Sequence, residues 1–127
     1  MGGLPFWLLQ KNPTVRLRSS DPKFLGYVDK WYSVLYQKLS PMSIGNGGPI
    51  LMLQIENEYG SYAAQTSHSD TEYLIYLRDK AKQYFGNSIV LFSTDGGKNS
   101  NAFDVTCKDY PFQNNFFGTL QVAGQSY

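Results

Sequence analysis

The chain is poor in the residues from which disulfide frameworks and metal centres are built. It contains one cysteine, Cys107, and one histidine, His68, among 127 residues. A lone cysteine has no partner for a disulfide within the chain, so we expect Cys107 to be a free thiol. One cysteine and one histidine also fall short of the ligand set of a zinc site. The sequence therefore predicts no metal and no cofactor.

The chain also lacks an excess of positive or negative charge and long apolar runs. The formal net charge is +1 at pH 7, and the scattered Lys and Arg residues form no basic patch of the kind that binds nucleic acid. No apolar run reaches the roughly 18 residues of a transmembrane helix, and no signal-peptide pattern opens the chain. We expect no nucleic-acid partner and no membrane span. The composition gives no indication of an oligomeric state.

Polar residues follow directly on the most apolar stretch of the chain. Residues 50–55 are apolar except for Gln54, which predicts a strand covered on both faces, as in parallel sheets. Glu56, Asn57 and Glu58 come next. In a parallel α/β barrel the carboxyl ends of the strands form the active-site face, where a glutamate is well placed for catalysis. The same carboxylates would equally suit the capping region of a following helix or a solvated loop.

Strand alternation predicts which of these side chains point together. It places Gln54, Glu56 and Glu58 on one side and the residues between them on the other. Burying two carboxylates and an amide at one place is costly unless they are hydrogen-bonded or used in function. We therefore expect a polar site formed by these three side chains.

Helical and strand-like segments alternate on both sides of this stretch. Ser20-Asp21-Pro22 has the residues of a helix start. The helix that follows, to about Leu39, has an apolar stripe of Phe24, Tyr27, Val28, Trp31, Leu35 and Leu39. Glycines and a proline in 45–49 then break the chain.

A second helix is predicted over 73–85, after a cap within 67–70 and before Gly86 as its C-cap. Arg78, Lys80 and Lys82 are expected on its outer side. Residues 89–93 form a second short strand, and residues 114–120 are apolar enough for another. This order predicts an α/β fold with parallel strands, either a barrel or an open doubly wound sheet.

The segment around Glu58 resembles the signature of glycoside hydrolase family 35, the β-galactosidases. The signature residues are Gly47-Gly48-Pro49, Gln54 and Glu56-Asn57-Glu58-Tyr59. The resemblance extends over roughly residues 2–107, with a short insertion at about 65–70. It includes Gly2-Gly3-Leu4-Pro5, Trp7-Leu8-Leu9, Arg16, Arg18, Ser20-Asp21-Pro22 and Leu91 to Gly96.

The resemblance implies a partial (β/α)8 TIM barrel, with residues 1–127 as a fragment of a catalytic barrel that supplies about strands 4 to 6 and the intervening helices. It implies retaining hydrolysis of terminal non-reducing β-D-galactose in β-galactoside glycans, in a lysosomal, vacuolar or extracellular setting. By the same resemblance Glu58 is the general acid/base and Asn57 binds the sugar, at its 2-hydroxyl. Gln54 and Glu56 are expected either to orient Glu58 or to touch the sugar. Tyr59 and Tyr62 are expected to line the sugar site.

The resemblance also places the second catalytic carboxylate, the nucleophile, beyond this C-terminus. No glutamate follows Glu72, and Asp95, Asp104 and Asp109 match no nucleophile motif. A barrel of this kind takes about 250 residues, so we expect an internal fragment carrying half of a catalytic pair. An inactive remnant or weak sugar-binding module therefore stays open as an alternative. Transfer to another sugar instead of water would use the same residues.

Relatives of this family in the secretory pathway pair a cysteine near position 107 with one soon after the Asn57 to Gly60 segment. Here the matching region reads Ala63-Ala64-Gln65. The resemblance therefore implies that this bridge is lost or rearranged.

Overall fold

The structure is a computed structural model and describes residues 3–94. The expectations for Asp95, Asp104, Cys107, Asp109 and the strand at 114–120 lie outside the described residues.

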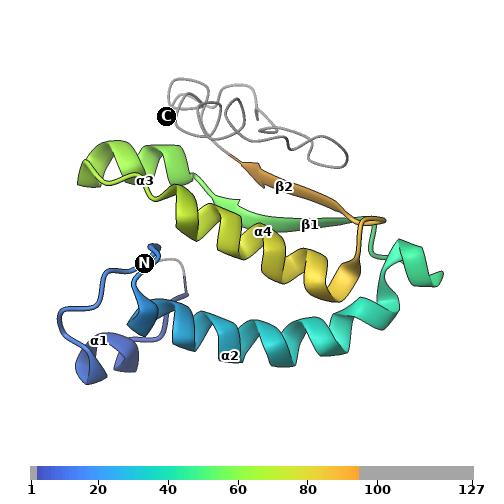
Figure 1. The fold of residues 1–127 in the computed structure, drawn as a ribbon, viewed down its shortest axis with the longest axis horizontal. Coiled ribbons are helices and arrows are strands. Elements are labelled where there is room, and N and C mark those ends of the chain that lie inside the picture. Colours follow the sequence, from blue (N-terminus) through green and yellow to red (C-terminus); the bar gives the residue numbers. More distant parts are fainter. Residues whose placement is uncertain (1–2, 95–127) are drawn as a thin grey trace.

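Helices alternate with two parallel strands in the described part of the chain (Figure 1). The order is α1 (Trp7–Lys11), α2 (Pro22–Leu39), the 3-10 turns η1 (Ser40–Met42) and η2 (Ile44–Asn46), β1 (Met52–Asn57), α3 (Tyr59–Thr66), α4 (Thr71–Phe85) and β2 (Val90–Thr94). β1 and β2 pair in parallel. The predicted α/β class with parallel strands is confirmed, and the arrangement is consistent with part of a TIM barrel.

Both long helices begin at an aspartate, as the sequence predicts. The Asp21 carboxylate accepts a hydrogen bond from the Lys23 N–H at the start of α2, and Pro22 occupies its first turn. The Asp70 carboxylate accepts from the Tyr73 N–H at the start of α4. These bonds satisfy backbone donors that have no partner inside a helix. α4 ends at Gly86, whose φ of +67° is accessible to glycine without strain.

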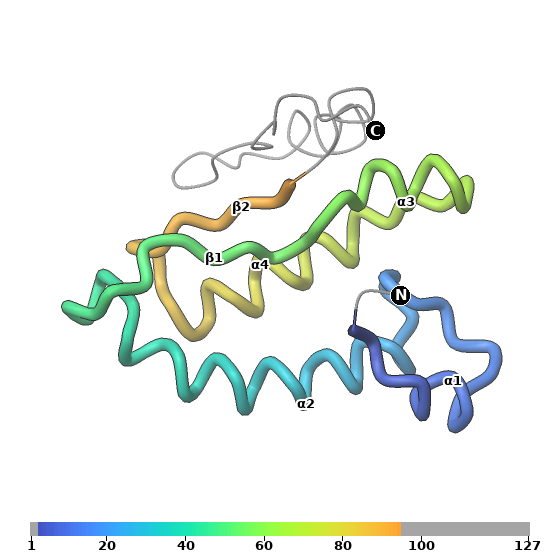
Figure 2. The backbone as a smooth tube through the Cα atoms, turned by 180° about the vertical axis from the view of Figure 1, so that it is seen from behind, coloured from blue at the N-terminus to red at the C-terminus, as the bar shows by residue number. Residues whose placement is uncertain are grey.

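The two long helices lie on the same side of the sheet, as the two opposite views show (Figures 1 and 2). α4 contacts both β1 and α2. Aromatic residues make much of the contact between the helices: Phe24 of α2 packs against Tyr73 of α4, and Tyr36 meets Phe85 edge-on at 5.1 Å between ring centroids. None of the helices within residues 3–94 is long and apolar enough to cross a bilayer.

The apolar stripe predicted for α2 is wrong at Trp31. Its side chain is 62% exposed, whereas Tyr36, which the stripe omitted, is 2% exposed. Tyr32 and Tyr36 stack at 4.5 Å between centroids with nearly parallel rings. Because residues four apart share one side of a helix, this pair defines the inward face and leaves Trp31 off it.

The outward placement predicted for Lys80 is also wrong. Only 10% of its side chain is exposed, and its Nζ lies 2.7 Å from the Asp29 carboxylate of α2. Lysine can bury its aliphatic stem while its ammonium group reaches a partner. Lys80 therefore lies between α4 and α2 and joins them.

The prediction that the first strand is covered on both faces is wrong for the described residues. Leu51 and Met52 are 59% and 41% exposed, and Ile55 alone in β1 is buried. α4 packs on one face of β1, and within residues 3–94 no helix covers the other. α3 was not predicted, because its eight residues have no clear apolar repeat, although Tyr59, Gly60 and Ala63 are buried.

Candidate functional site

An irregularity in β1 decides where its polar side chains point. Gln54 pairs with Phe92 and Glu56 pairs with Ser93, so Ile55 is one extra residue opposite a continuous β2. A bulge of this kind inserts a residue and reverses the alternation that follows it. The prediction that Gln54 and Glu56 share a face is therefore wrong. Glu56 lies with buried Ser93 on the helix side, and Asn57 lies beside Thr94.

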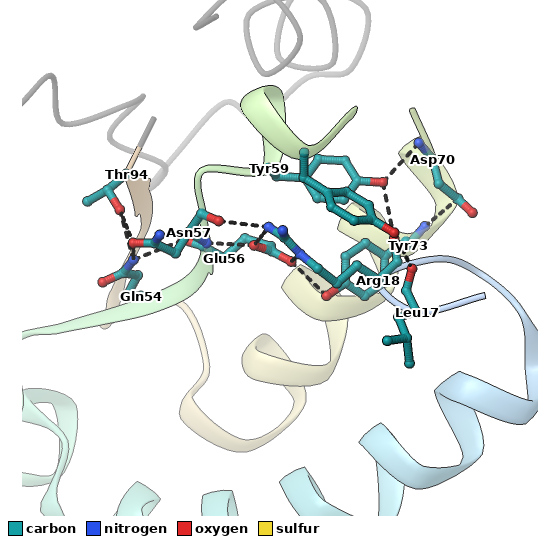
Figure 3. A network of polar contacts seen from close by, with 10 residues as sticks. Leu17, Arg18, Gln54, Glu56, Asn57, Tyr59, Asp70, Tyr73 and Thr94 are labelled. Atoms are coloured by element: carbon teal, nitrogen blue, oxygen red, sulfur yellow. Dashed lines mark hydrogen bonds and ion pairs between the residues drawn. The ribbon is translucent and has the colours of Figure 1, made fainter. Parts of the chain in front are cut away.

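On the helix side, the Glu56 carboxylate is held by three groups (Figure 3). Arg18 donates from Nε to Oε1 at 3.0 Å and from Nη2 to Oε2 at 2.6 Å. The Tyr73 hydroxyl donates to Oε1 at 2.8 Å, and the Asn57 N–H donates to Oε2 at 2.6 Å. Only 7% of the Glu56 side chain is exposed. Four donors to one buried carboxylate compensate its loss of hydration.

Arg18 in turn packs against two neighbouring tyrosine rings. Its guanidinium carbon lies 4.4 Å from the Tyr62 ring centroid and 5.3 Å from that of Tyr59. Partial burial acts to lower the pKa of Arg18, but its hydrogen bonds and charge interaction with Glu56 outweigh burial and raise it. The Tyr62 hydroxyl donates to the Leu17 carbonyl at 2.9 Å, which ties α3 to the segment that carries Arg18.

Tyrosines around this pair are held in the protonated form. Burial, reinforced by the neighbouring Glu56 carboxylate, raises the pKa of Tyr73 far above its usual value. Burial also raises the pKa of Tyr59 to about 12. Tyr59 is 1% exposed and accepts a hydrogen bond from the Asp70 N–H at 3.0 Å. Its burial fits a residue that supports the site from behind and does not fit one that stacks on a sugar.

On the opposite face, three polar side chains form a second cluster at the ends of the strands. Asn57 Oδ1 accepts from the Thr94 hydroxyl at 2.7 Å and from the Gln54 amide at 3.1 Å. Gln54 also donates to the Thr94 hydroxyl oxygen at 3.0 Å. Because the Asn57 oxygen takes both of these bonds, its NH2 group is the part left to donate to a ligand.

Glu58 follows the strand in an unusual backbone conformation. Its φ is +49°, in the left-handed region, which costs a residue with a Cβ about 1–2 kcal/mol. Its N–H donates to the Thr94 carbonyl at 2.5 Å, and its carbonyl accepts from the Tyr62 N–H at 3.0 Å. Glu58 occupies the N-cap position of α3, but its side chain makes no capping hydrogen bond. Glu58 therefore stands where a capping residue would stand, but its carboxylate does not cap the helix.

The exposed Glu58 side chain borders a broad cleft. The cleft has a volume of about 1450 Å³ and is also lined by Gln54, Glu56, Asn57 and Tyr62. Pockets for small ligands enclose roughly 300–1,000 Å³, so this is a large open trough, bordered by α1, α2, the end of β1 and α3. It brings a carboxylate, an amide donor and an aromatic ring together at the carboxyl end of β1.

Residues with no predicted role complete the site. Arg18 was noticed only as part of the family resemblance, and Tyr73 only as a helix residue. Thr94 could have been found from the parallel pairing, since the last residues of neighbouring strands lie side by side. Among residues 3–94, no group of three or more His, Cys, Asp or Glu side chains could hold a metal ion.

Comparison with known proteins shows the family of the chain. Residues 1–123 match the family model described as glycosyl hydrolases family 35. The chain belongs to this family. Similar proteins include Beta-galactosidase 8 of Oryza sativa subsp. japonica, 50% identical over 97 residues, and Beta-galactosidase of Homo sapiens, 50% identical over 96 residues. Beta-galactosidase 17 of Arabidopsis thaliana is 45% identical over 97 residues.

Each of these matches includes 76% of this chain but only 13–14% of the similar protein. The chain thus spans a small part of the length of the relatives it matches.

Proposed function

We propose that residues 1–127 form part of the catalytic domain of a retaining β-galactosidase. In this proposal the domain is a (β/α)8 barrel, and the chain supplies about strands 4 to 6, beginning with β1 and β2. The observation that carries the proposal is the exposed Glu58 carboxylate, placed beside Asn57 at the carboxyl end of a parallel strand in a family 35 chain. Barrel enzymes place their catalytic groups at this end of their strands.

In the proposed mechanism Glu58 is the general acid/base. It protonates the oxygen of the departing group and later takes a proton from the attacking water. Retaining hydrolysis needs a second carboxyl group about 5–5.5 Å away, which attacks the anomeric carbon. Glu56 is not suited to that role, since four hydrogen bonds occupy its oxygens. The nucleophile is therefore proposed to come from another part of the enzyme.

Asn57 is proposed to bind the sugar through its NH2 group. Thr94 and Gln54 donate to its oxygen, so the orientation of the amide is fixed and its NH2 group points away from them. A hydrogen bond to the 2-hydroxyl strengthens as the oxocarbenium-like transition state develops. Gln54 and Glu56 thus orient the groups that act, and Tyr62 borders the sugar site.

The proposed substrates are glycans with terminal, non-reducing β-D-galactose, because several curated relatives are named beta-galactosidases. We place the enzyme in a lysosomal, vacuolar or extracellular setting on the same grounds of similarity. Transfer of galactose to another sugar is the same chemistry with a different acceptor.

The test is the Glu58→Gln variant of the polypeptide that contains this chain, assayed on aryl and alkyl β-galactosides. Loss of the acid should lower kcat by about 10²–10⁴-fold on substrates with poor leaving groups. For activated substrates kcat/KM should fall less, because the leaving group needs no proton, and azide should partly restore the turnover that is lost with the general base. Glu72→Gln is the matched control, because Glu72 is exposed in the first turn of α4. Undiminished activity of Glu58→Gln on alkyl galactosides would contradict the proposal.

A second candidate is that the 127-residue chain on its own is an inactive remnant or a weak sugar-binding module. The exposed apolar side chains of Leu51, just before β1, and Met52, at its start, favour it for the isolated chain. Hydrolysis of an aryl β-galactoside by the 127-residue chain, abolished by Glu58→Gln, would exclude this candidate.

A further inference from the structure

Arg18 reaches the peptide group that joins Asn57 to Glu58. Its Nη2 donates to the Asn57 carbonyl oxygen at 2.7 Å. On the other side of the same peptide bond, the Glu58 N–H donates to the Thr94 carbonyl. A peptide group is planar, so holding both its C=O and its N–H fixes the orientation of the whole group. These two contacts therefore set the direction in which the chain enters Glu58.

Arg18 has little freedom to move away from this peptide. Its Nε and Nη2 form a fork on the two oxygens of Glu56 at 3.0 and 2.6 Å. The guanidinium group also packs against the neighbouring rings of Tyr59 and Tyr62. A lysine could keep the charge, but it could not reproduce the planar fork together with the bond to the Asn57 carbonyl.

The conformation at Glu58 is the kind that needs such support. A residue with a Cβ stays in the left-handed region only when its surroundings determine it, and residues of this type cluster at functional sites. Glu58 has a φ of +49°, and its own carbonyl is held by the Tyr62 N–H. With the peptide before it fixed by Arg18 and Thr94, the backbone of Glu58 is held on both sides.

We propose that Arg18 is a positioning residue for the acid/base step. It holds the Asn57–Glu58 peptide, and thereby keeps the Glu58 carboxylate at the cleft and the Asn57 amide beside Thr94. The inference rests on the proposed function of Glu58. Arg18 acts through Glu58 and Asn57 and touches no reacting atom.

The kinetic test compares Arg18→Lys with the wild-type enzyme that contains this chain, using an activated dinitrophenyl β-galactoside and an alkyl β-galactoside. Misplacing the acid should lower kcat/KM by about 10–100-fold on the alkyl substrate, whose leaving group needs a proton from the enzyme. On the dinitrophenyl substrate, departure of the leaving group needs no proton, so kcat/KM, which reports the steps up to formation of the galactosyl-enzyme, should change by less than about threefold. A purely structural role would lower both equally, and that result would overturn the inference.

Two further variants separate the possible failures. Arg78→Lys is the matched control, because Arg78 also lies 2.6 Å from a carboxylate, that of Asp79 on the same helix. It should leave both rates unchanged. Glu58→Gln reports on the proposed function itself: if it lowers kcat/KM equally on the alkyl and dinitrophenyl substrates, the role of Glu58 is wrong. If Glu58→Gln lowers kcat/KM mainly on the alkyl substrate and Arg18→Lys does not, only the role of Arg18 is wrong.

A structural readout is independent of activity. Arg18 itself has a φ of +51°, so glycine can replace it without backbone strain. In the 127-residue Arg18→Gly chain, NMR backbone shifts and the intraresidue HN–Hα distance should show Glu58 leaving the left-handed region. Circular dichroism would verify that the helices are kept. A Glu58 that retains its positive φ in this variant would overturn the inference.

Discussion

The Tyr73 hydroxyl lies 2.8 Å from Glu56 Oε1 and so joins α4 to the end of β1. A second tyrosine on the same helix, Tyr76, donates to the Asp29 carboxylate at 2.9 Å. The two bonds have nearly equal lengths but different surroundings: the Glu56 side chain is 7% exposed and that of Asp29 is 49% exposed.

Replacement of each tyrosine by phenylalanine should therefore have unequal effects. Tyr73→Phe leaves a buried charge with one donor fewer and should lower the free energy of unfolding by about 1.5–3 kcal/mol. Tyr76→Phe exposes Asp29 to water that can replace the lost donor, so its cost should stay below about 1 kcal/mol. Urea denaturation of the two variants measures the difference. Equal losses would contradict the central place given to the Glu56 network.

The Asp70→Asn variant should lose stability in a pH-dependent way. Asp70 is 9% exposed and accepts from the Ser20 N–H and hydroxyl at 2.7 and 2.9 Å. Burial acts to raise the pKa of Asp70, but the hydrogen bonds from Ser20 and Tyr73 outweigh it and lower the pKa below its usual value. A lowered pKa means that the charged form stabilises the folded state above the unfolded-state pKa of about 3.9.

At neutral pH the free energy of unfolding of the wild type should thus exceed that of Asp70→Asn by about 1–3 kcal/mol. This difference should disappear as the pH falls below about 4. Denaturation curves between neutral and acidic pH measure it. Asp79→Asn is the control, since Asp79 is 57% exposed and an exposed ion pair contributes about 0–1 kcal/mol. An advantage that persists at low pH would show that charge is not its source.

Two glycines should respond oppositely to alanine. A Cβ on Gly48 would meet the Met42 carbonyl oxygen at 2.1 Å, and backbone cannot move away as a side chain can. Gly26 lies inside α2 with nothing within 4 Å of such a Cβ. Gly26→Ala should raise the free energy of unfolding by about 0.5–1 kcal/mol, whereas Gly48→Ala should lower it. Thermal or urea denaturation distinguishes the two signs.

Thr94→Val should weaken catalysis through Asn57. The Thr94 hydroxyl donates to Asn57 Oδ1 at 2.7 Å, and without it the amide is held only by Gln54. Loss of one hydrogen bond that aims a sugar-binding group should lower kcat/KM by about tenfold. The assay uses an aryl β-galactoside and the enzyme that contains this chain. Thr14→Val, in an exposed loop, is the control, and an unchanged kcat/KM in Thr94→Val would contradict the role given to Asn57.

Much of the fold was predictable because its signals are local. The aspartates that cap α2 and α4, and the glycine that ends α4, sit next to the helices that they delimit. The position of Glu58 just after a strand could be read in the same way. The inward face of α2 could not, because it depends on which side α4 occupies, and neither Trp31 nor Tyr36 carries that information.

The arrangement of the site was less predictable, because one extra residue changes it. The sequence of residues 52–57 does not predict a bulge at Ile55, because the bulge depends on the register in which β1 pairs with β2. Glu56 likewise finds its partner 38 positions away in Arg18, across a contact that no periodic pattern encodes. The sequence indicated which residues are polar, and the pairing of the strands decides on which face of the sheet each of them lies.

The bulge at Ile55 gives the neighbouring residues Glu56 and Asn57 different roles. Up to Gln54 the strand follows one phase, and after Ile55 it follows the other, so Glu56 stabilises the interior while Asn57 is free for a ligand. If Ile55 instead paired with Ser93, Glu56 would lie opposite Thr94 and Asn57 would turn to the helix side, so the amide and the carboxylate would exchange faces. The identity of the groups on each face of this strand end therefore depends on the register of the pairing as much as on side-chain chemistry.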